Sequence, residues 1–172
     1  MHSLSKKEQT THILCRQLAD ILLKNKLKLV TAESCTGGLI SAACTDLAGS
    51  SDWFERGFVT YSNAAKIELL GVDAALIETH GAVSDAVARA MAFGAVRHGG
   101  HNAAQISIAV TGIAGPSGGS AAKPVGTVWL GFSVQGRLHS EKQCFAGDRA
   151  TVREQTVTHA LQRLLALLSD NT

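Results

Sequence analysis

Between Thr31 and Gly38 the chain has to pass from an apolar strand straight into a helix, and this turn constrains the fold more than any other segment. We expect the strand over residues 27–33, because its first positions are mostly apolar. Good helix formers follow the turn, so we expect a helix from about Thr36 to Leu47, closed by Gly49.

The side chains of this turn allow two interpretations. Unpaired N–H groups point outward at the start of a helix, so an exposed Ser34 or Cys35 could act there as a nucleophile beside donors for an oxyanion. Alternatively, Ser34 or Thr36 caps the helix, and Gly37 and Gly38 only permit the tight turn.

The rest of the chain alternates between helical and strand patterns. We expect helices at residues 6–25, 62–70 and 84–96 and from Asp148 onward, strands at 58–61 and 105–110, and a hairpin of 125–134 with 138–145. Asn63 is an alternative to Ser62 as the cap of the second helix. This order predicts a single α/β domain in which helices cover a mixed sheet.

Composition narrows the class of protein. The 172 residues are 45% apolar and 17% charged, which suits one globular domain. The net charge is +2, and no Lys/Arg run is interleaved with aromatic residues, so we expect no nucleic-acid partner. The polar N-terminus and the lack of a bilayer-length apolar run predict a cytoplasmic protein without membrane contact.

The cysteines and histidines do not form a metal-binding pattern. The four cysteines show no C-x-x-C spacing, and Cys15 and Cys44 fall in helical patterns, as expected of buried thiols in a reducing cytosol. His98 and His101 form the one close histidine pair, in a glycine-rich run that is more typical of a loop than of a metal site.

A tyrosine and a lysine flank the start of the helix expected at 62–70. Lys66 would lie in its first turn, where the helix dipole disfavours an ammonium group. Burial would also lower the pKa of Lys66, toward that of a general base. Tyr61, the single tyrosine, could present a catalytic hydroxyl. Taken singly, Tyr61 is as well explained by packing at the core edge and Lys66 by a solvated surface position.

Seven blocks of this sequence, in order, resemble the CinA C-terminal domain family. They are Glu33–Gly38, Thr60–Lys66, Leu69–Val72, His80–Ser84, Thr111–Pro116, Lys123–Val128 and Gly147–Arg149. The resemblance implies a three-layer α/β/α sandwich with a mixed sheet, forming one domain over residues 1–172 and assembling as a homo-oligomer. Longer relatives carry a further, metal-dependent nucleotide pyrophosphatase domain, and we do not expect that activity here.

The same resemblance implies an activity. Members studied as enzymes are nicotinamide-nucleotide amidases, which convert nicotinamide mononucleotide to nicotinate mononucleotide and ammonia in pyridine nucleotide salvage. The family's catalytic serine, tyrosine and lysine fall on Ser34, Tyr61 and Lys66. Ser34 would attack the amide carbon, and neutral Lys66 would accept its proton directly or through the Tyr61 hydroxyl. This chemistry requires neither a metal nor an organic cofactor.

Substrate contacts are expected from two further segments. N–H groups near Cys35 to Gly38 would hold the oxyanion, and the loop 112–119 with Arg149 would bind the phosphate. The expected substrate-binding residues are therefore Glu33, Cys35, Thr36, Gly37, Gly38, Thr111, Gly112, Gly115 and Arg149. Alternatively, the loop merely links two strands and Arg149 is a surface cation.

The sequence also allows other functional interpretations. Residues 115–119 match G-x-S-x-G, with Asp148 and His159 following in α/β-hydrolase order, but no convincing helix follows the serine. Asp148 and His159 would also lie roughly 16 Å apart along one helix. Cys35 is a rival nucleophile to Ser34, although Lys66 suits a serine better. A nucleotide- or partner-binding module without catalysis, or an amidase of another small carboxamide, stays open.

Overall fold

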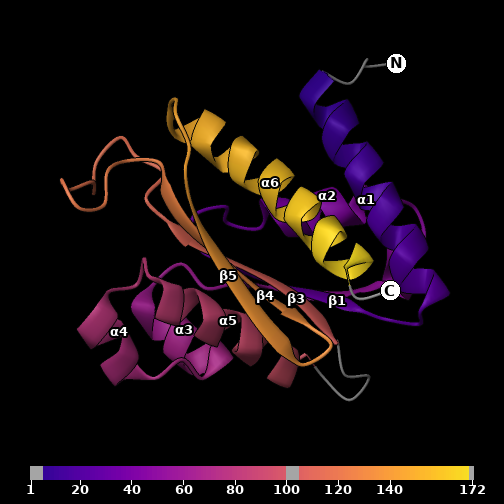
Figure 1. The fold of residues 1–172 in the computed structure, drawn as a ribbon, viewed down its shortest axis with the longest axis horizontal. Coiled ribbons are helices and arrows are strands. Elements are labelled where there is room, and N and C mark those ends of the chain that lie inside the picture. Colours follow the sequence, from indigo (N-terminus) through magenta and orange to yellow (C-terminus); the bar gives the residue numbers. More distant parts are fainter. Residues whose placement is uncertain (1–5, 100–104, 171–172) are drawn as a thin grey trace.

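In the computed structural model, which describes residues 6–99 and 105–170, a five-stranded mixed sheet lies between two layers of helices (Figure 1). In chain order the elements are α1 (Lys6–Lys24), β1 (Leu29–Glu33), α2 (Leu39–Thr45), the 3-10 helix η1 (Ser50–Asp52), β2 (Phe54–Val59), α3 (Asn63–Leu70), α4 (Ala74–His80), α5 (Asp85–Arg97), β3 (Ile106–Gly112), β4 (Thr127–Val134), β5 (Arg137–Cys144) and α6 (Arg149–Ser169).

The strand order β2-β1-β3-β4-β5 brings three carboxyl ends to one edge of the sheet. β1 is parallel to both β2 and β3, whereas β4 and β5 pair antiparallel. The neighbouring strands β1 and β2 lead into helices on opposite faces, α2 and α3 (Figure 1). Such a divergence opens a crevice at the carboxyl edge, which is where α/β sheets bind ligands.

Each face of the sheet has its own hydrophobic core, which confirms the α/β/α sandwich. Helices α1, α2 and α6 cover one face, with fully buried side chains such as Leu18, Leu161 and Phe132 between them and the sheet. Helices α3, α4 and α5 cover the other face, where Val30 and Met91 are fully buried.

Helix caps were the most reliable signals in the sequence. Ser62 accepts a hydrogen bond from the Ala65 N–H and caps α3, and Gly71 ends that helix with a φ of 65°. Ser84 and Asp148 cap α5 and α6 in the same way, as predicted. Each such cap satisfies an N–H group that would otherwise lack a partner.

Two expected boundaries were wrong by three residues or more and one helix was missed, each for a local reason. Helix α2 begins at Leu39, not near Thr36, because Gly37 and Gly38 adopt left-handed conformations and delay it. Strand β2 runs over 54–59 instead of 58–61, since an edge strand exposes the polar residues that hid its start. The seven-residue helix α4 was missed, because Ile77 is its one buried side chain.

The structure also bears on the cysteine and histidine predictions. Trp53 is 1% exposed and belongs to the core, and Cys15 and Cys44 are buried thiols, as expected. His101 lies outside the described residues. Within residues 6–99 and 105–170, no group of three or more His, Cys, Asp or Glu could hold a metal, and no helix is long and apolar enough to cross a bilayer.

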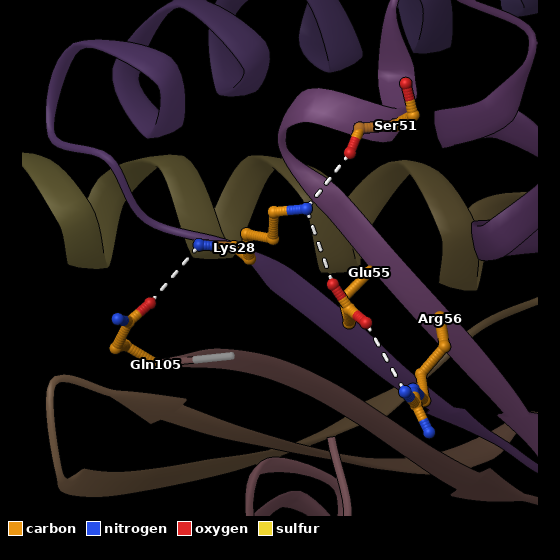
Figure 2. A network of polar contacts seen from close by, with 5 residues as sticks. All are labelled: Lys28, Ser51, Glu55, Arg56 and Gln105. Carbon is orange, nitrogen blue, oxygen red and sulfur yellow. Dashed lines mark hydrogen bonds and ion pairs between the residues drawn. The ribbon is translucent and has the colours of Figure 1, made fainter. Parts of the chain in front are cut away.

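A polar network ties three strands together at the end of β1 opposite the crevice (Figure 2). The Lys28 N–H donates to Gln105 ahead of β3, and its ammonium contacts the Ser51 carbonyl at 3.1 Å and Glu55 at 3.4 Å. Arg56 contacts the other Glu55 oxygen at 3.3 Å. These contacts link the segment before β1 to the segment before β3 and to the start of β2.

Candidate active site

A cavity of about 220 Å³ opens at the carboxyl edge of β1, β2 and β3. Turns after all three parallel strands, the α4–α5 connection and the start of α6 contribute to it. The lining residues are Ser34, Cys35, Tyr61, Asn63, Lys66, Ala82, Val83, Thr111, Gly112, Ala114 and Arg149.

Ser34 and Lys66 meet at the floor of this cavity. The Lys66 Nζ lies 3.1 Å from the Ser34 Oγ, within hydrogen-bonding distance. Their side chains are almost fully buried, with 7% of Ser34 and 1% of Lys66 exposed. A hydroxyl beside a buried amine is the arrangement that a serine nucleophile with a lysine base requires.

Lys66 reaches Ser34 because its side chain folds back over the start of α3. Side chains on a helix lean toward its N-terminus, and the Lys66 ammonium meets the carbonyls of Thr60 at 2.9 Å and Tyr61 at 3.2 Å. Desolvation by burial lowers the pKa of Lys66 below its ordinary value. The same burial therefore positions the amine and favours its neutral, basic form.

Cys35 lies in a less reactive environment than its neighbour. The side chain is 5% exposed, and burial raises the pKa of the Cys35 thiol to about 11. The nucleophilic form of cysteine is the thiolate, which such a thiol does not form near neutral pH. These properties favour Ser34 over Cys35 as the nucleophile.

The Glu33 carboxylate lies beneath the turn and not in the cavity. It is fully buried and accepts hydrogen bonds from five donors of the turn and of α2. These are the Thr36 hydroxyl and the N–H groups of Gly38 and Ile40 on one oxygen, and the N–H and hydroxyl groups of Ser41 on the other, at 2.7 to 3.0 Å. Glu33 thus supplies the cap that α2 lacks from its own N-cap residue, Gly38.

This carboxylate changes which N–H groups remain for a substrate. The N–H of Gly38 is taken by Glu33, and that of Gly37 by the Ser34 carbonyl at 3.1 Å. In contrast, no oxygen of the described residues accepts a hydrogen bond from the N–H groups of Cys35 and Thr36. Of these two residues, Thr36 is fully buried and does not line the cavity, so the donors expected between Cys35 and Gly38 are reduced to the Cys35 N–H.

Arg149 bridges two segments at the cavity mouth. Its Nη1 donates to the Gly115 carbonyl at 2.8 Å, and its Nη2 donates to the Tyr61 hydroxyl at 3.1 Å. The Tyr61 side chain is 61% exposed. The Lys66 ammonium contacts the backbone carbonyl of Tyr61 and not the Tyr61 hydroxyl. The guanidinium is oriented from both sides, as a site for an anionic group requires.

The expected site residues divide into two groups. Those that line the cavity are Ser34, Cys35, Tyr61, Lys66, Thr111, Gly112 and Arg149. Those that lie outside its lining are Glu33, Thr36, Gly37, Gly38 and Gly115. Glu33 and Thr36 hold the turn from below, and Gly115 holds Arg149.

Sequence reasoning missed several residues of the site. The apolar wall of Ala82, Val83 and Ala114 has no chemical signature, although all three lie in motif blocks of the sequence. Arg153 was also missed, yet its Nε and Nη2 donate to the carbonyls of Cys35 and Thr36 at 3.1 and 2.8 Å. Arg153 follows Arg149 by four residues on the same helix, so both arginines would lie on one helix face, and this spacing was the available sequence signal.

The rival hydrolase triad is not assembled. Ser117 lies on an exposed loop, the Asp148 carboxylate accepts from the Thr151 N–H, and His159 contacts Glu141. The G-x-S-x-G match is therefore a loop sequence without its partners, as its missing helix predicted.

The chain is similar to several known proteins. The family model of the CinA C-terminal domain matches residues 11–168. The nicotinamide-nucleotide amidohydrolase PncC of Enterobacter agglomerans is 52% identical over 159 residues, covering 92% of this chain and 95% of its own. The protein of that name from Escherichia coli K12 is 46% identical over 160 residues, with the same two coverages. The crystal structure of the competence/damage inducible protein CihA from Agrobacterium tumefaciens matches with a TM-score of 0.88 and 42% identity, covering 97% of this chain and 99% of that one.

Proposed function

Because this chain belongs to the CinA C-terminal domain family, we propose that it hydrolyses the carboxamide of nicotinamide mononucleotide to nicotinate mononucleotide and ammonia. The observation that carries the proposal is the 3.1 Å contact between the Ser34 hydroxyl and the buried Lys66 amine. The names of the relatives at 46% and 52% identity support the choice of substrate.

The reaction begins with Ser34. Its oxygen attacks the carboxamide carbon while its proton passes to the neutral Lys66 amine, and the carbonyl oxygen becomes an oxyanion. The N–H group of Cys35 then donates to that oxygen. A preorganised donor of this kind contributes about 3 kcal/mol to the transition state in comparable sites.

The intermediate collapses when Lys66 returns a proton to the leaving nitrogen. Ammonia departs, and the nicotinoyl group remains as an ester on Ser34. A water molecule then attacks the ester carbon, Lys66 accepts its proton, and Ser34 recovers that proton as nicotinate mononucleotide leaves. Lys66 acts as base and then as acid in both halves, and no metal or organic cofactor takes part.

Three features suit the cavity to this nucleotide. The small apolar side chains of Ala82, Val83 and Ala114 offer a wall for the pyridine ring. Arg149 offers a guanidinium to the phosphate at the mouth. We further propose that residues 1–172 form one amidohydrolase domain, acting in the cytoplasm in pyridine nucleotide salvage.

The role of Tyr61 follows from the same contacts. Lys66 lies within direct reach of Ser34, so the relay does not need the Tyr61 hydroxyl. That hydroxyl accepts a hydrogen bond from Arg149 instead. We therefore assign the side chain of Tyr61 to the orientation of Arg149 and its carbonyl to the orientation of Lys66.

Ammonia release from nicotinamide mononucleotide tests the proposal. Wild-type protein is expected to release ammonia in the presence of a chelator, and Lys66→Ala is expected to release none, because Ser34 then lacks its base. Wild-type protein that binds the nucleotide without turnover would favour a binding module. Turnover of simpler carboxamides alone would indicate an amidase with another substrate.

A further inference from the structure

Helix α6 touches the nucleophile turn through one side chain that the mechanism above does not use. Arg153 lies one helical turn after Arg149, is partly buried, and does not line the cavity. Its Nε donates to the Cys35 carbonyl at 3.1 Å and its Nη2 to the Thr36 carbonyl at 2.8 Å.

The bond to the Thr36 carbonyl reaches the Cys35 N–H, the oxyanion donor that lines the cavity, through two peptide units. In a trans peptide the C=O and N–H groups point in opposite directions, so the Thr36 carbonyl held by Arg153 directs the Gly37 N–H away from α6. The Gly37 N–H donates to the Ser34 carbonyl, which orients the Cys35 N–H in the same manner. The Cys35 N–H is therefore aligned through two linked carbonyls.

We propose that Arg153 is a positioning residue for the oxyanion site, holding and polarising the peptide unit between Thr36 and Gly37 and, through the Gly37 N–H, the unit that carries the Cys35 N–H. This inference rests on the proposed amidase function. A guanidinium bonded to a carbonyl draws charge along the peptide, which makes the N–H of that unit a stronger donor.

Glu33 and Arg153 hold the turn through different groups of its backbone. Glu33 holds the turn through its donors, at Thr36 and Gly38, whereas Arg153 holds it through its acceptors. The left-handed Gly37 and Gly38 allow the carbonyls of the turn to face α6, since they adopt φ values of 60° and 98°. Glu33 and Arg153 thus hold the turn from two sides, and Arg153 does so without contacting the reacting atoms.

Steady-state kinetics of Arg153→Gln and Arg153→Lys with nicotinamide mononucleotide tests the proposal. Removal of the charge is expected to lower kcat about tenfold or more while KM changes less than about twofold, because the contact matters in the transition state and not in the ground state. Lysine restores the charge but not both bonds, so Arg153→Lys should recover part of kcat. Binding of the product, nicotinate mononucleotide, should be unchanged in both variants.

Arg163→Gln is the matched control. Arg163 lies on the same helix and contacts Glu141 at 2.9 Å, away from the turn, so its kcat should equal that of wild type. A folded Arg153→Gln variant with wild-type kcat would overturn the inference, as would a loss confined to KM. If Arg153→Gln does not fold, Arg153→Lys decides by the same criterion. Absence of turnover in the wild type would instead refute the proposed function.

Discussion

At the scale of single residues, neighbouring groups in this site differ because burial acts on them in opposite directions. Burial lowers the pKa of the Lys66 ammonium and raises that of the Cys35 thiol, since each environment disfavours the charged form. A neutral amine is a base, but a neutral thiol is a poor nucleophile. The same physical effect therefore prepares Lys66 for catalysis and disfavours Cys35.

The rate of amide hydrolysis should depend on pH through Lys66. The active form is the neutral amine, so kcat/KM should rise with pH through a pKa below the ordinary lysine value. The free energy of unfolding should depend on pH with the same sign. Between the pKa of Lys66 in the folded state and its higher pKa in the unfolded state, the folded protein binds fewer protons than the unfolded chain, so its stability rises with pH. A pH–rate profile free of any such rise would contradict Lys66 as the base.

Replacement of Tyr61 distinguishes a direct proton transfer from a relay. If the Tyr61 hydroxyl only orients Arg149, Tyr61→Phe should raise KM several-fold and leave kcat within about twofold. A relay through that hydroxyl predicts a fall in kcat of about a hundredfold or more. Measured kcat and KM for the variant and for Arg149→Lys, which should share the KM effect, decide between the two.

At the scale of elements, the β1–α2 turn depends on the buried Glu33 carboxylate. An amide in its place would turn a donor group toward donors of the turn, so Glu33→Gln should lower the free energy of unfolding by about 2–4 kcal/mol. Glu55→Gln is the control, because Glu55 pairs with Lys28 and Arg56 near the surface (Figure 2) and should matter much less. Equal denaturation midpoints for both variants would contradict this account.

The elements also show what the sequence could and could not predict. Capping side chains act over three or four residues, so Ser62, Ser84 and Asp148 marked helix starts correctly. The start of α2 was misplaced because left-handed Gly37 and Gly38 delay it and because its cap comes from Glu33, seven residues before Ile40 and beyond the reach of an ordinary capping pattern. Ser34 and Lys66 were predicted together through a family resemblance and the chemistry of each, whereas their 3.1 Å contact depends on strand order.

At the scale of the whole molecule, the site belongs to the sheet and not to any single segment. Parallel pairing of β1, β2 and β3 brings Ser34, Tyr61 and Gly112 to one edge, and α6 adds Arg149 from the end of the chain. The contacts of Arg153 could not be predicted for the same reason, because they span 117 and 118 residues.

Assembly is a prediction at the same scale. The family resemblance implies a homo-oligomer, and the side chains of Val59 in β2 and Leu69 in α3 are 50% and 45% exposed. Burial of such apolar surface favours association. Light scattering should therefore give a mass that is a multiple of 18.0 kDa, and a mass of 18.0 kDa at working concentrations would contradict the prediction.

The central claim is that Ser34, activated by Lys66, attacks the carboxamide of nicotinamide mononucleotide. Ammonia release by wild type, Ser34→Ala and Cys35→Ala, measured side by side with chelator present, tests it most directly. We predict turnover by the wild type, none by Ser34→Ala, and most of the activity in Cys35→Ala, because the Cys35 thiol stays protonated. Activity that survives in Ser34→Ala and disappears in Cys35→Ala would contradict the claim.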